Sequence, residues 1–562
     1  MGKKKKQTAN QIDNQTINNI KKSFLNILKK NWKQLLFLAI LVFIAYCNSF
    51  KGQFLSDDIE AIVENKNIGN ILYYFRTQPL TFMRYLVYYI TQKINGVDPF
   101  AFKIMNFSFH LTTVLAVYVL ILIIHTPLVA LLTASLFAVH PILSENANWI
   151  SGGVHAQYTF FIILSFIFYL LSKKSSWLFK YYILSIIFYL LGILTTEKAI
   201  VLFPILFLYE VSFDNLKKTW KRLLPFASIA FLWVILFLSF SRISNRILAL
   251  ETGHYQTGRF YNPLTQIPTA ISSYLRLIFW PDGLTLYHSE MAFGPIKYTI
   301  MAIVTVSFFA FLIWSWKRNK KNFFWGSFFI ASLLPMLTPF RVAWVVAERY
   351  VYLGSLGIFV VFILLMTKII KDRKILYIIM AIIIVGLTTR TLIRNKDWQN
   401  QDTLWLSAAK TSPSSSQNHN NLGDLYARQG DYQKAIEEFK KAIEIKPNYG
   451  DAYHNLANIY HQIGDNEQAI ENYQKALFFN PNLWQSYQNL AATHFEEGDL
   501  NKSLEYMNKA LEINPGSEEL YINTSIIYIK LDDIETAKIY LNKALEINPE
   551  NEKVKSFLRS LP

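Results

Sequence analysis

Long apolar runs fill the chain from about residue 35 to residue 392 and constrain its fold more than any other feature. About eleven of them follow one another: Leu35–Phe50, Phe102–Ile124, Leu128–Val139, Thr159–Leu171, Leu178–Leu194, Ala199–Tyr209, Leu223–Phe240, Tyr298–Trp316, Phe323–Leu337, Tyr350–Met366 and Ile375–Leu392. A segment in lipid has to satisfy its own backbone N–H and C=O groups, so runs of this kind predict helices. Several are shorter than the roughly 20 residues that cross a bilayer and need flanking residues to do so. We therefore expect residues 34–394 to form an all-α, polytopic membrane domain with about eleven spans.

Clusters of lysine and arginine between the runs predict the orientation of this domain. They precede the first run and follow the fourth, sixth, eighth and tenth, at Lys29–Lys33, Lys173–Lys180, Lys217–Arg222, Lys317–Lys321 and Lys368–Lys374. With an odd number of spans all five clusters fall on one side, and the positive-inside rule makes that side cytoplasmic. The basic segment 1–33 is then cytoplasmic, the chain is a multi-pass protein of the cell membrane, and everything after Arg394 lies outside.

Composition agrees with this interpretation and argues against several classes of protein. The chain is 52% hydrophobic and only 17% charged, whereas soluble domains carry about 25% charged residues. Its net charge of +17 comes largely from residues between apolar runs rather than on one solvated face, so nucleic acid is not an expected partner. The one cysteine, Cys47, allows neither a disulfide framework nor a thiolate metal cluster. The lipid bilayer is the partner that the composition predicts.

A repeat with a period of 34 residues occupies the C-terminal part. It is marked by Pro413, Pro447, Pro481, Pro515 and Pro549, with small and aromatic residues at fixed positions between them. This pattern is typical of tetratricopeptide repeats, in which small residues let two antiparallel helices touch and Pro ends the second helix. We expect a linker and half-repeat over residues 395–415, then an α-solenoid of four repeats and a closing helix over residues 416–562. Three periodic tyrosines are interpreted as packing residues, with ligand contact as the alternative: Tyr453, Tyr487 and Tyr521.

The first outer loop, residues 51–101, carries the strongest candidates for chemistry. Asp57 and Asp58 are adjacent carboxylates beside a membrane surface, where ionisation is costly and pKa values rise. Such carboxylates act as proton acceptors, although Asp57 is equally well placed to cap the helix that follows. The loop is much longer than a connector, which favours a function, and it also holds Arg76 and Arg84 among several tyrosines.

Histidines and a glutamate near other spans are further candidates. His110 lies within the second span, where a packed, hydrogen-bonded histidine is the commoner case and a proton carrier is the alternative. His140 and Glu145 follow the third span. Together with Asp58 they offer a set of ligands for a divalent cation, although no spacing in the sequence requires a metal.

Positive charge on the outer side is a separate signal, because the inside rule leaves that side poor in it. Three arginines supply it: Arg276, Arg341 and Arg349. Anionic phosphate near the outer headgroups is one reason for such charge, since a guanidinium group matches phosphate oxygens. An ion pair of Glu348 with Arg341 or Arg349 is the alternative. Glu197 and Lys198 at the outer end of the fifth span form a pair that neutralises itself, unless a substrate uses it.

The order of these motifs resembles that of the transmembrane and tetratricopeptide-repeat-containing O-mannosyltransferases, including their bacterial relatives, in the C-class (GT-C) of integral-membrane glycosyltransferases. The resemblance runs from about Leu35 to Pro562 and rests on Phe54–Asn65 with its Asp pair, Pro79–Leu80 followed by Gly96, Pro99, Asn106 and His110, Ala138–Pro141 with Glu145, Ala347–Arg349 with Tyr352, Ser355 and Gly357, and the bridge from Arg394 through Trp398 to Trp405. Two positions depart from the family pattern. Gln78 stands where Arg usually precedes the Pro–Leu pair, and Thr195–Glu197 stands where Ser-Lys-Glu is usual, with Lys198 next to it.

The resemblance implies a GT-C membrane domain whose donor substrate is a sugar, mannose, carried on a polyprenyl phosphate. The acceptor is then a Ser/Thr hydroxyl of an extracytoplasmic protein that the repeats recruit, and transfer is a single, inverting displacement. Asp57 or Asp58 takes the proton of the acceptor. The donor phosphate is held by Arg349 with Arg276, Arg84, Arg341 or Lys198, and the remaining substrate contacts are His140, Glu145, Glu197, His110 and Arg76.

Other functions fit parts of the same pattern. The sugar acceptor is a lipid or a surface glycan in one alternative, and the repeats then serve assembly only. In another, the chain is a non-enzymatic, membrane-anchored scaffold, but about eleven spans exceed what an anchor needs. A transporter is expected to bury charges in the middle of the membrane, and the sequence places few there.

Overall fold

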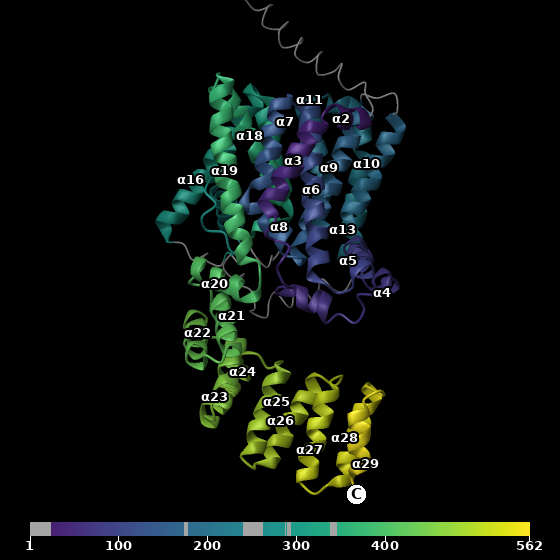
Figure 1. Cartoon of the computed structure of the whole chain (residues 1–562), viewed down its shortest axis with the longest axis vertical. Helices are drawn as coiled ribbons and strands as arrows, with labels where there is room; N and C mark the ends of the chain where they lie inside the picture. The colour runs from purple at the N-terminus through teal and green to yellow at the C-terminus, as the bar shows by residue number, and fades with distance from the viewer. Residues whose placement is uncertain (1–23, 174–177, 240–261, 287, 289–293, 338–344) are drawn as a thin grey trace, which may run out of the picture. The chain divides into compact units, whose positions relative to one another are not determined.

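The computed structural model describes residues 24–173, 178–239, 262–286, 288, 294–337 and 345–562. Within these ranges every regular element is a helix, so the predicted all-α class is confirmed. The chain divides into two compact units, Met1–Ser407 and Ala408–Pro562 (Figure 1).

In the first unit each of the eleven apolar runs coincides with a helix: α3 (Trp32–Tyr46), α6 (Pro99–Ile124), α7 (Pro127–Val139), α9 (Val154–Ser172), α10 (Leu178–Ile193), α11 (Leu202–Phe213), α13 (Leu224–Ser239), α16 (Pro295–Arg318), α17 (Lys320–Leu333), α18 (Tyr352–Ile369) and α19 (Arg373–Asp397). Other elements precede or connect them: α2 (Phe24–Lys30), η1 (Ile59–Val63), α4 (Ile71–Thr77), η2 (Pro79–Thr81), α5 (Phe82–Asn95), η3 (Pro141–Leu143), α8 (Ser144–Asn148), η4 (Ser151–Gly153), η5 (Glu197–Val201), α12 (Leu216–Thr219), η6 (Trp220–Arg222), α15 (Pro263–Phe279), η8 (Leu334–Met336) and η9 (Glu348–Val351).

Five stretches of the described chain are long and apolar enough to cross a membrane on their own: Pro99–Ile124, Ser151–Ser172, Pro295–Arg318, Glu348–Ile369 and Arg373–Asp397. The number rises to seven if each of two bent helix pairs forms one span, namely α7 with Pro141–Asn148 and Leu216–Arg222 with Leu224–Phe237. Helices of this kind characterise a membrane protein. The count of about eleven spans stays a prediction, because the other apolar helices are shorter than a bilayer crossing.

Burial separates an inner set of these helices from an outer set. In the most apolar window of the α9 stretch 83% of residues are buried, and in that of α6 56% are. The corresponding shares in α16 and α19 are only 11% and 22%. Contiguous apolar surface left exposed on long helices is what lipid tails cover in a membrane protein, so α16 and α19 are suited to the lipid-facing rim.

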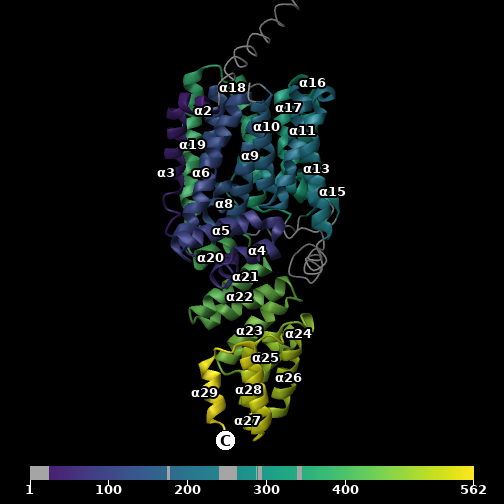
Figure 2. The same cartoon turned by 90° about the vertical axis from the view of Figure 1, so that its right-hand side faces the viewer.

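The helices alternate in direction, and this alternation sorts the connections between two ends of the first unit (Figures 1 and 2). The basic connections after α11, α16 and α18 lie at one end. The connections after α3, α7, α10 and α17 lie at the other end, where α5 and α8 are found. The loops that carry most of the candidate residues therefore lie at the end opposite the basic clusters.

The second unit consists of helix pairs that follow α20 (Gln401–Thr411): α21 (Ser416–Arg428) with α22 (Tyr432–Ile445), α23 (Gly450–Gln462) with α24 (Asn466–Phe479), α25 (Trp484–Glu496) with α26 (Leu500–Ile513), α27 (Glu518–Lys530) with α28 (Ile534–Ile547), and the closing α29 (Glu552–Ser560). An aspartate caps each second helix at the same point of the period: Asp431, Asp465, Asp499 and Asp533. In the first three repeats the residue before it is a glycine with positive φ, a conformation that costs glycine little. The predicted solenoid of four repeats is thus present.

Candidate functional site

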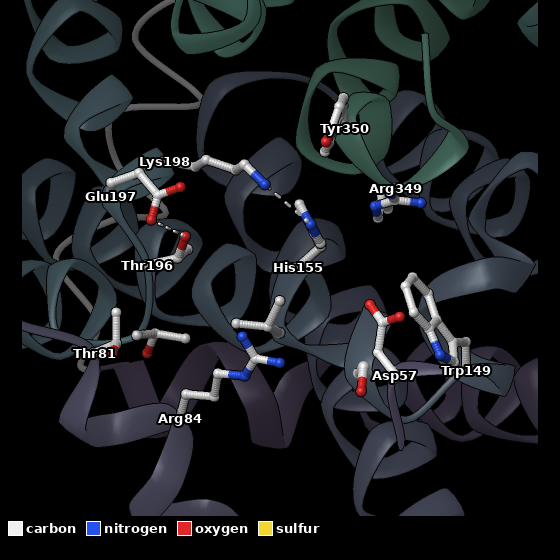
Figure 3. Close-up of a pocket in the computed structure, with 13 residues that line it drawn as sticks. Asp57, Thr81, Arg84, Trp149, His155, Thr196, Glu197, Lys198, Arg349 and Tyr350 are labelled. Atoms are coloured by element: carbon white, nitrogen blue, oxygen red, sulfur yellow. Dashed lines mark hydrogen bonds between the residues drawn. The ribbon is translucent and has the colours of Figure 1, made fainter. Parts of the chain in front are cut away.

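A polar cavity of about 280 Å³ opens at the end of the first unit that carries the long loops. Its lining comes from the loop after α3, the η2–α5 segment, the connection between α7 and α9, the first turn of α9, η5 with the residues before it, and η9. The side chains that line it are Asp57, Thr81, Arg84, Trp149, Ser151, Val154, His155, Thr195, Thr196, Glu197, Lys198, Arg349 and Tyr350 (Figure 3). Two carboxylates, Asp57 and Glu197, and three cationic side chains therefore share one small space.

Asp57 supplies one of the two carboxylates of this cavity. Figure 3 shows its side chain turned toward the space between Arg84, His155 and Arg349. Its Oδ1 accepts a hydrogen bond of 3.1 Å from the Ser56 hydroxyl, and Ser56 has a φ of 48°. That left-handed conformation is uncommon for a residue with a side chain and costs about 1–3 kcal/mol, so the surrounding fold holds this turn in place.

The alternative that Asp57 caps the following helix is wrong. Asp58, not Asp57, occupies the residue before η1, and its side chain makes no capping hydrogen bond there. The two adjacent carboxylates instead point to different surroundings, one to the cavity and one to the protein interior.

Asp58 is fully buried and ties two loops together. Its Oδ1 accepts a hydrogen bond of 2.7 Å from the Ser151 backbone N–H, and its Oδ2 accepts one of 3.1 Å from the Leu55 backbone N–H. Burial raises the pKa of Asp58 to about 6, against the opposing effect of these hydrogen bonds and of the positive charge of Lys103. Asp58 thus holds the turn that presents Asp57 and has no face on the cavity.

The connection between α7 and α9 fixes the Asp57 turn from the other side. The Trp149 indole N–H donates to the Leu55 carbonyl at 3.2 Å. Lys103 Nζ donates to the Asn148 carbonyl at 2.8 Å, and Asn106 Nδ2 donates to the Trp149 carbonyl at 2.9 Å. A glycine suits position 153, because a Cβ there would lie 1.9 Å from Asn106 Oδ1 and would force that side chain to shift. Sequence reasoning missed the role of Lys103, although a lysine at the start of an apolar run was a usable signal.

Arg349 is held from one side and faces the cavity on the other. Its Nη1 lies 2.6 Å from Glu145 Oε1, and its backbone N–H donates to Glu145 Oε2 at 2.8 Å. Its guanidinium carbon also lies 5.2 Å from the Trp149 ring centre and 5.1 Å from that of Tyr350. The ion pair with Glu145 orients this guanidinium group at the cavity wall, where its positive charge attracts an anion.

Lys198 and Arg84 are the other two cations of the cavity. Lys198 Nζ lies 4.5 Å from the centre of the Tyr350 ring and 3.4 Å from His155 Nε2. The Arg84 guanidinium lies 5.7 Å from the Tyr88 ring centre, and its Nε has no hydrogen-bond partner among the described residues. A buried guanidinium N–H without a partner favours an anionic ligand at this position.

Glu197 also lines the cavity, as the sequence led us to expect, and accepts a hydrogen bond of 3.0 Å from the Thr196 hydroxyl. Several other predicted site residues lie elsewhere. Arg276 is not among the cavity residues, and its Nη2 pairs with Asp282 at 2.9 Å, both well exposed. Arg76 is likewise absent from the lining. Arg341 lies outside the described residues.

His110, His140 and Glu145, which the resemblance offered as substrate contacts, lie outside the cavity lining and contact other groups of the protein. His110 Nδ1 lies 2.7 Å from the Tyr352 hydroxyl inside the helix core, which supports the packed alternative. His140 Nε2 lies 2.8 Å from the Ile278 carbonyl. Glu145 has no exposed surface and engages Arg349. None of the three lines the cavity, because tertiary packing turns each toward a partner in the interior.

Arg341, one of the two ion-pair partners that the sequence offered for Glu348, lies outside the described residues, whereas Arg349 pairs with Glu145 and another arginine contacts Glu348. Glu348 lies buried, and its Oε1 accepts from Arg394 Nη2 at 3.3 Å. The predicted set of metal ligands is also not assembled, since Asp58, His140 and Glu145 each engage separate groups of the protein. In the described part of the chain no three His, Cys, Asp or Glu side chains group in a way that fits a metal ion.

The fold and the cavity define a class, an all-helical membrane protein with a polar site at one end of its helices and a tetratricopeptide solenoid. Comparison of the sequence with curated proteins shows which members of this class the chain is similar to. The chain is 24% identical over 475 residues to the human protein O-mannosyl-transferase TMTC3, and 22% identical over 493 residues to human TMTC4. Each alignment covers 73% of this chain, with 51% of TMTC3 and 66% of TMTC4. A shorter stretch of 107 residues is 32% identical to Tmtc2 of Drosophila melanogaster and covers 18% of this chain and 11% of that protein.

These relatives confirm the resemblance to the TMTC protein O-mannosyl-transferases that the motifs predicted. The chain spans about half the length of the TMTC3 proteins it matches. Tetratricopeptide repeat families match residues 414–477, 457–498 and 494–561. Among solved structures, the crystal structure of MamA protein is 25% identical over 27% of this chain and 82% of that chain, with a TM-score of 0.24. That of YrrB is 22% identical over 34% and 97%, with a TM-score of 0.25.

Proposed function

We propose that this chain is a membrane glycosyltransferase that moves mannose from a polyprenyl-phosphate donor to a Ser or Thr hydroxyl of a protein. The observation that carries the proposal is the cavity in which the Asp57 carboxylate shares a small space with Arg84, Lys198 and Arg349. The names of the curated relatives supply the sugar and the kind of acceptor. The polyprenyl phosphate rests on the family resemblance and on the cationic lining.

Asp57 is the proton acceptor in this mechanism. A neutral hydroxyl is a weak nucleophile, so its oxygen attacks the anomeric carbon as its proton passes to the Asp57 carboxylate. The bond between that carbon and the phosphate oxygen breaks at the same time, and its electron pair leaves with the polyprenyl phosphate. By analogy with the family, this single displacement inverts the configuration of the sugar. Asp58 acts through Asp57 by holding the turn.

The three cations hold the donor and stabilise the charge that grows on the departing phosphate. Oriented donors in a site shielded from water stabilise such charge more than water does, because they need no reorganisation during the reaction. Arg349 is oriented by Glu145, and Lys198 by contacts that include His155 and Tyr350. Lys198 thereby supplies a cation although the lysine of the usual family motif is replaced by Thr196.

The proposal places the cavity on the outer side of the cell membrane. Positive charge clusters at the opposite end of the helices, and the positive-inside rule makes that end cytoplasmic. Arg394 near the end of α19 contacts Glu348, next to the cavity residue Arg349. The chain therefore leaves the membrane domain on the outer side, and the repeats are extracytoplasmic and bind the acceptor protein.

The test is transfer of labelled mannose from polyprenyl-phosphate mannose to a Ser/Thr peptide pool by purified protein in detergent. Asp57→Asn should lower the transfer rate by about 10²–10⁴, the usual contribution of general acid–base catalysis. Glu60→Gln is the matched control, because Glu60 is an exposed carboxylate of the same loop outside the cavity lining. Full activity of Asp57→Asn would refute the assignment of the base. Transfer to lipid or glycan but not to peptide would favour the alternative acceptor.

A further inference from the structure

A second cavity, of about 380 Å³, opens at the basic end of the first unit, opposite the cavity proposed for sugar transfer. The described residues that line it come from the end of α9, the start of α10 and η6: Ser172, Phe179, Tyr182, Lys221 and Arg222. The Tyr182 hydroxyl donates to the Arg222 carbonyl at 2.7 Å, and this hydrogen bond ties η6 to α10. Two cationic side chains are thus held beside two aromatic ones.

The cations of this cavity lack acidic partners in the described part of the chain. Lys221 and Arg222 form no ion pair there, although two acidic residues, Glu210 and Asp214, precede η6 in the sequence. The carboxylates of Glu210 and Asp214 both lie 2.6 Å from Lys173 Nζ. Helix α12 adds two more lysines that have no ion pair among the described residues. Positive charge therefore prevails around the cavity, which attracts an anionic ligand.

An exposed apolar stripe of α10 begins at the same cavity. It consists of Phe179, Ile183, Ile187 and Leu190, which share one face of the helix because they are three or four positions apart. Phe179 is 76% exposed, and the other three are 38–43% exposed. From Phe179 to Leu190 the helix rises about 16 Å at about 1.5 Å per residue. The hydrocarbon core of a bilayer is roughly 30 Å thick, so the stripe is about as long as one leaflet.

We propose that this cavity binds an anionic phospholipid, whose phosphate contacts Lys221 and Arg222 and whose acyl chain lies along the stripe of α10. A soluble phosphate uses the cations but leaves the apolar stripe uncovered. A zwitterionic phospholipid covers the stripe, but its headgroup carries a cation that Lys221 and Arg222 repel. Only a lipid with a net negative headgroup matches both features of the site.

The position of the site agrees with this ligand. The positive-inside rule predicts that the basic end faces the cytoplasmic leaflet, where anionic lipids attract basic segments. Basic pockets between membrane helices on that side are suited to lipid headgroups. The site lies at the end of the helices opposite the Asp57 cavity. Its binding of lipid therefore does not depend on the proposed sugar transfer.

The test measures binding of lipids to the full-length protein in neutral detergent by native mass spectrometry. Dioleoyl-phosphatidylglycerol is the anionic probe and dioleoyl-phosphatidylcholine the zwitterionic one. Wild type should bind the anionic lipid at least about tenfold more tightly, because its headgroup carries no cation. Dihexanoyl-phosphatidylglycerol should bind more weakly than the dioleoyl form, because its short chains cannot cover the stripe. Equal affinities for the two dioleoyl lipids, or for the long and short anionic lipids, would overturn the proposal.

Two variants remove the cations. Lys221→Gln with Arg222→Gln should lower the affinity for dioleoyl-phosphatidylglycerol about thirtyfold, at roughly fivefold per cation beside an anionic headgroup. Lys221→Gln alone should lower it about fivefold, and since this side chain is exposed, the fold should be unaffected. Unchanged affinity in both variants would refute the assignment of the headgroup site.

The matched control is Lys317→Gln with Arg318→Gln. These two cations are exposed in the last turn of α16, at the same end of the helices, and do not line the cavity. The control should bind both dioleoyl lipids like wild type. A loss of affinity equal to that of the Lys221 and Arg222 double variant would mean attraction to the basic end as a whole, and a defined site would then be excluded.

Discussion

The buried carboxyl of Asp58 gives the protein a pH dependence whose sign and size follow from the structure. Asp58 has no exposed surface, and its pKa rises from the ordinary value of 3.8 to about 6. The folded protein therefore holds this proton more tightly than the unfolded chain does. The stabilisation is complete below about pH 4 and is lost as the pH rises through about 6, with a total of about 3 kcal/mol.

The variant Asp58→Asn isolates this contribution. An amide resembles the protonated carboxyl in shape and stays neutral at every pH. The variant therefore does not lose this stabilisation between pH 4 and pH 8. The unfolding free energies of the variant and of wild type can be measured by chemical unfolding in detergent, followed by tryptophan fluorescence. Their difference should change by about 3 kcal/mol in favour of the variant over that range. The amide accepts the two backbone N–H groups less well than a carboxylate, which lowers its stability by a roughly constant amount.

Asp57→Asn is the control, because Asp57 is exposed and its carboxylate lies outside the buried turn. Its unfolding free energy should follow that of wild type across the pH range. The predicted pH dependence is wrong if the unfolding free energies of Asp58→Asn and wild type differ by a constant amount from pH 4 to pH 8. Asp58 would then titrate alike in the folded and unfolded protein.

Two further substitutions test the framework around the cavity. Glu145→Gln leaves the Arg349 guanidinium without its buried counter-charge. This variant should lower the free energy of unfolding by about 3–5 kcal/mol and raise the KM for the donor. An unchanged free energy of unfolding together with an unchanged KM would contradict the role assigned to this pair. Gly153→Ala drives a Cβ into Asn106 and should destabilise by about 1–3 kcal/mol in the same unfolding assay. Gly294→Ala, where a Cβ meets nothing within 4 Å, is its control, and equal stability of the two variants would show that the loop yields.

Most of the secondary structure was predictable because its signals are local. A run of apolar residues predicts a helix wherever it occurs in lipid, and all eleven runs coincide with helices. The period of 34 residues likewise identified the four repeats, since each repeat contacts mainly its neighbours and needs the same residues at the same positions. The number of complete spans was less predictable, because short apolar helices pair or bend in ways that length does not reveal.

The candidate site was predictable in its location and only partly in its residues. The sequence indicated the Asp57–Asp58 loop, Arg84, Glu197, Lys198 and Arg349, and the structure brings Asp57 and these four to one cavity. It also suggested several residues that the structure places elsewhere: Arg76, Arg276, His110, His140 and Glu145. Residue type and proximity to the outer surface are shared by both groups, so these criteria do not separate them.

Membrane helices, a basic end, an opposite end rich in candidate residues and a repeat solenoid are thus all predictable from the order of amino acids. The tertiary structure alone decided that Asp57 faces the cavity while Asp58 is buried, and that Arg349 pairs with Glu145 across 204 positions of the sequence. The reason is physical. Helix formation and repeat periodicity depend on residues within one or two turns, whereas the direction of a side chain in a loop depends on which distant segments pack against it.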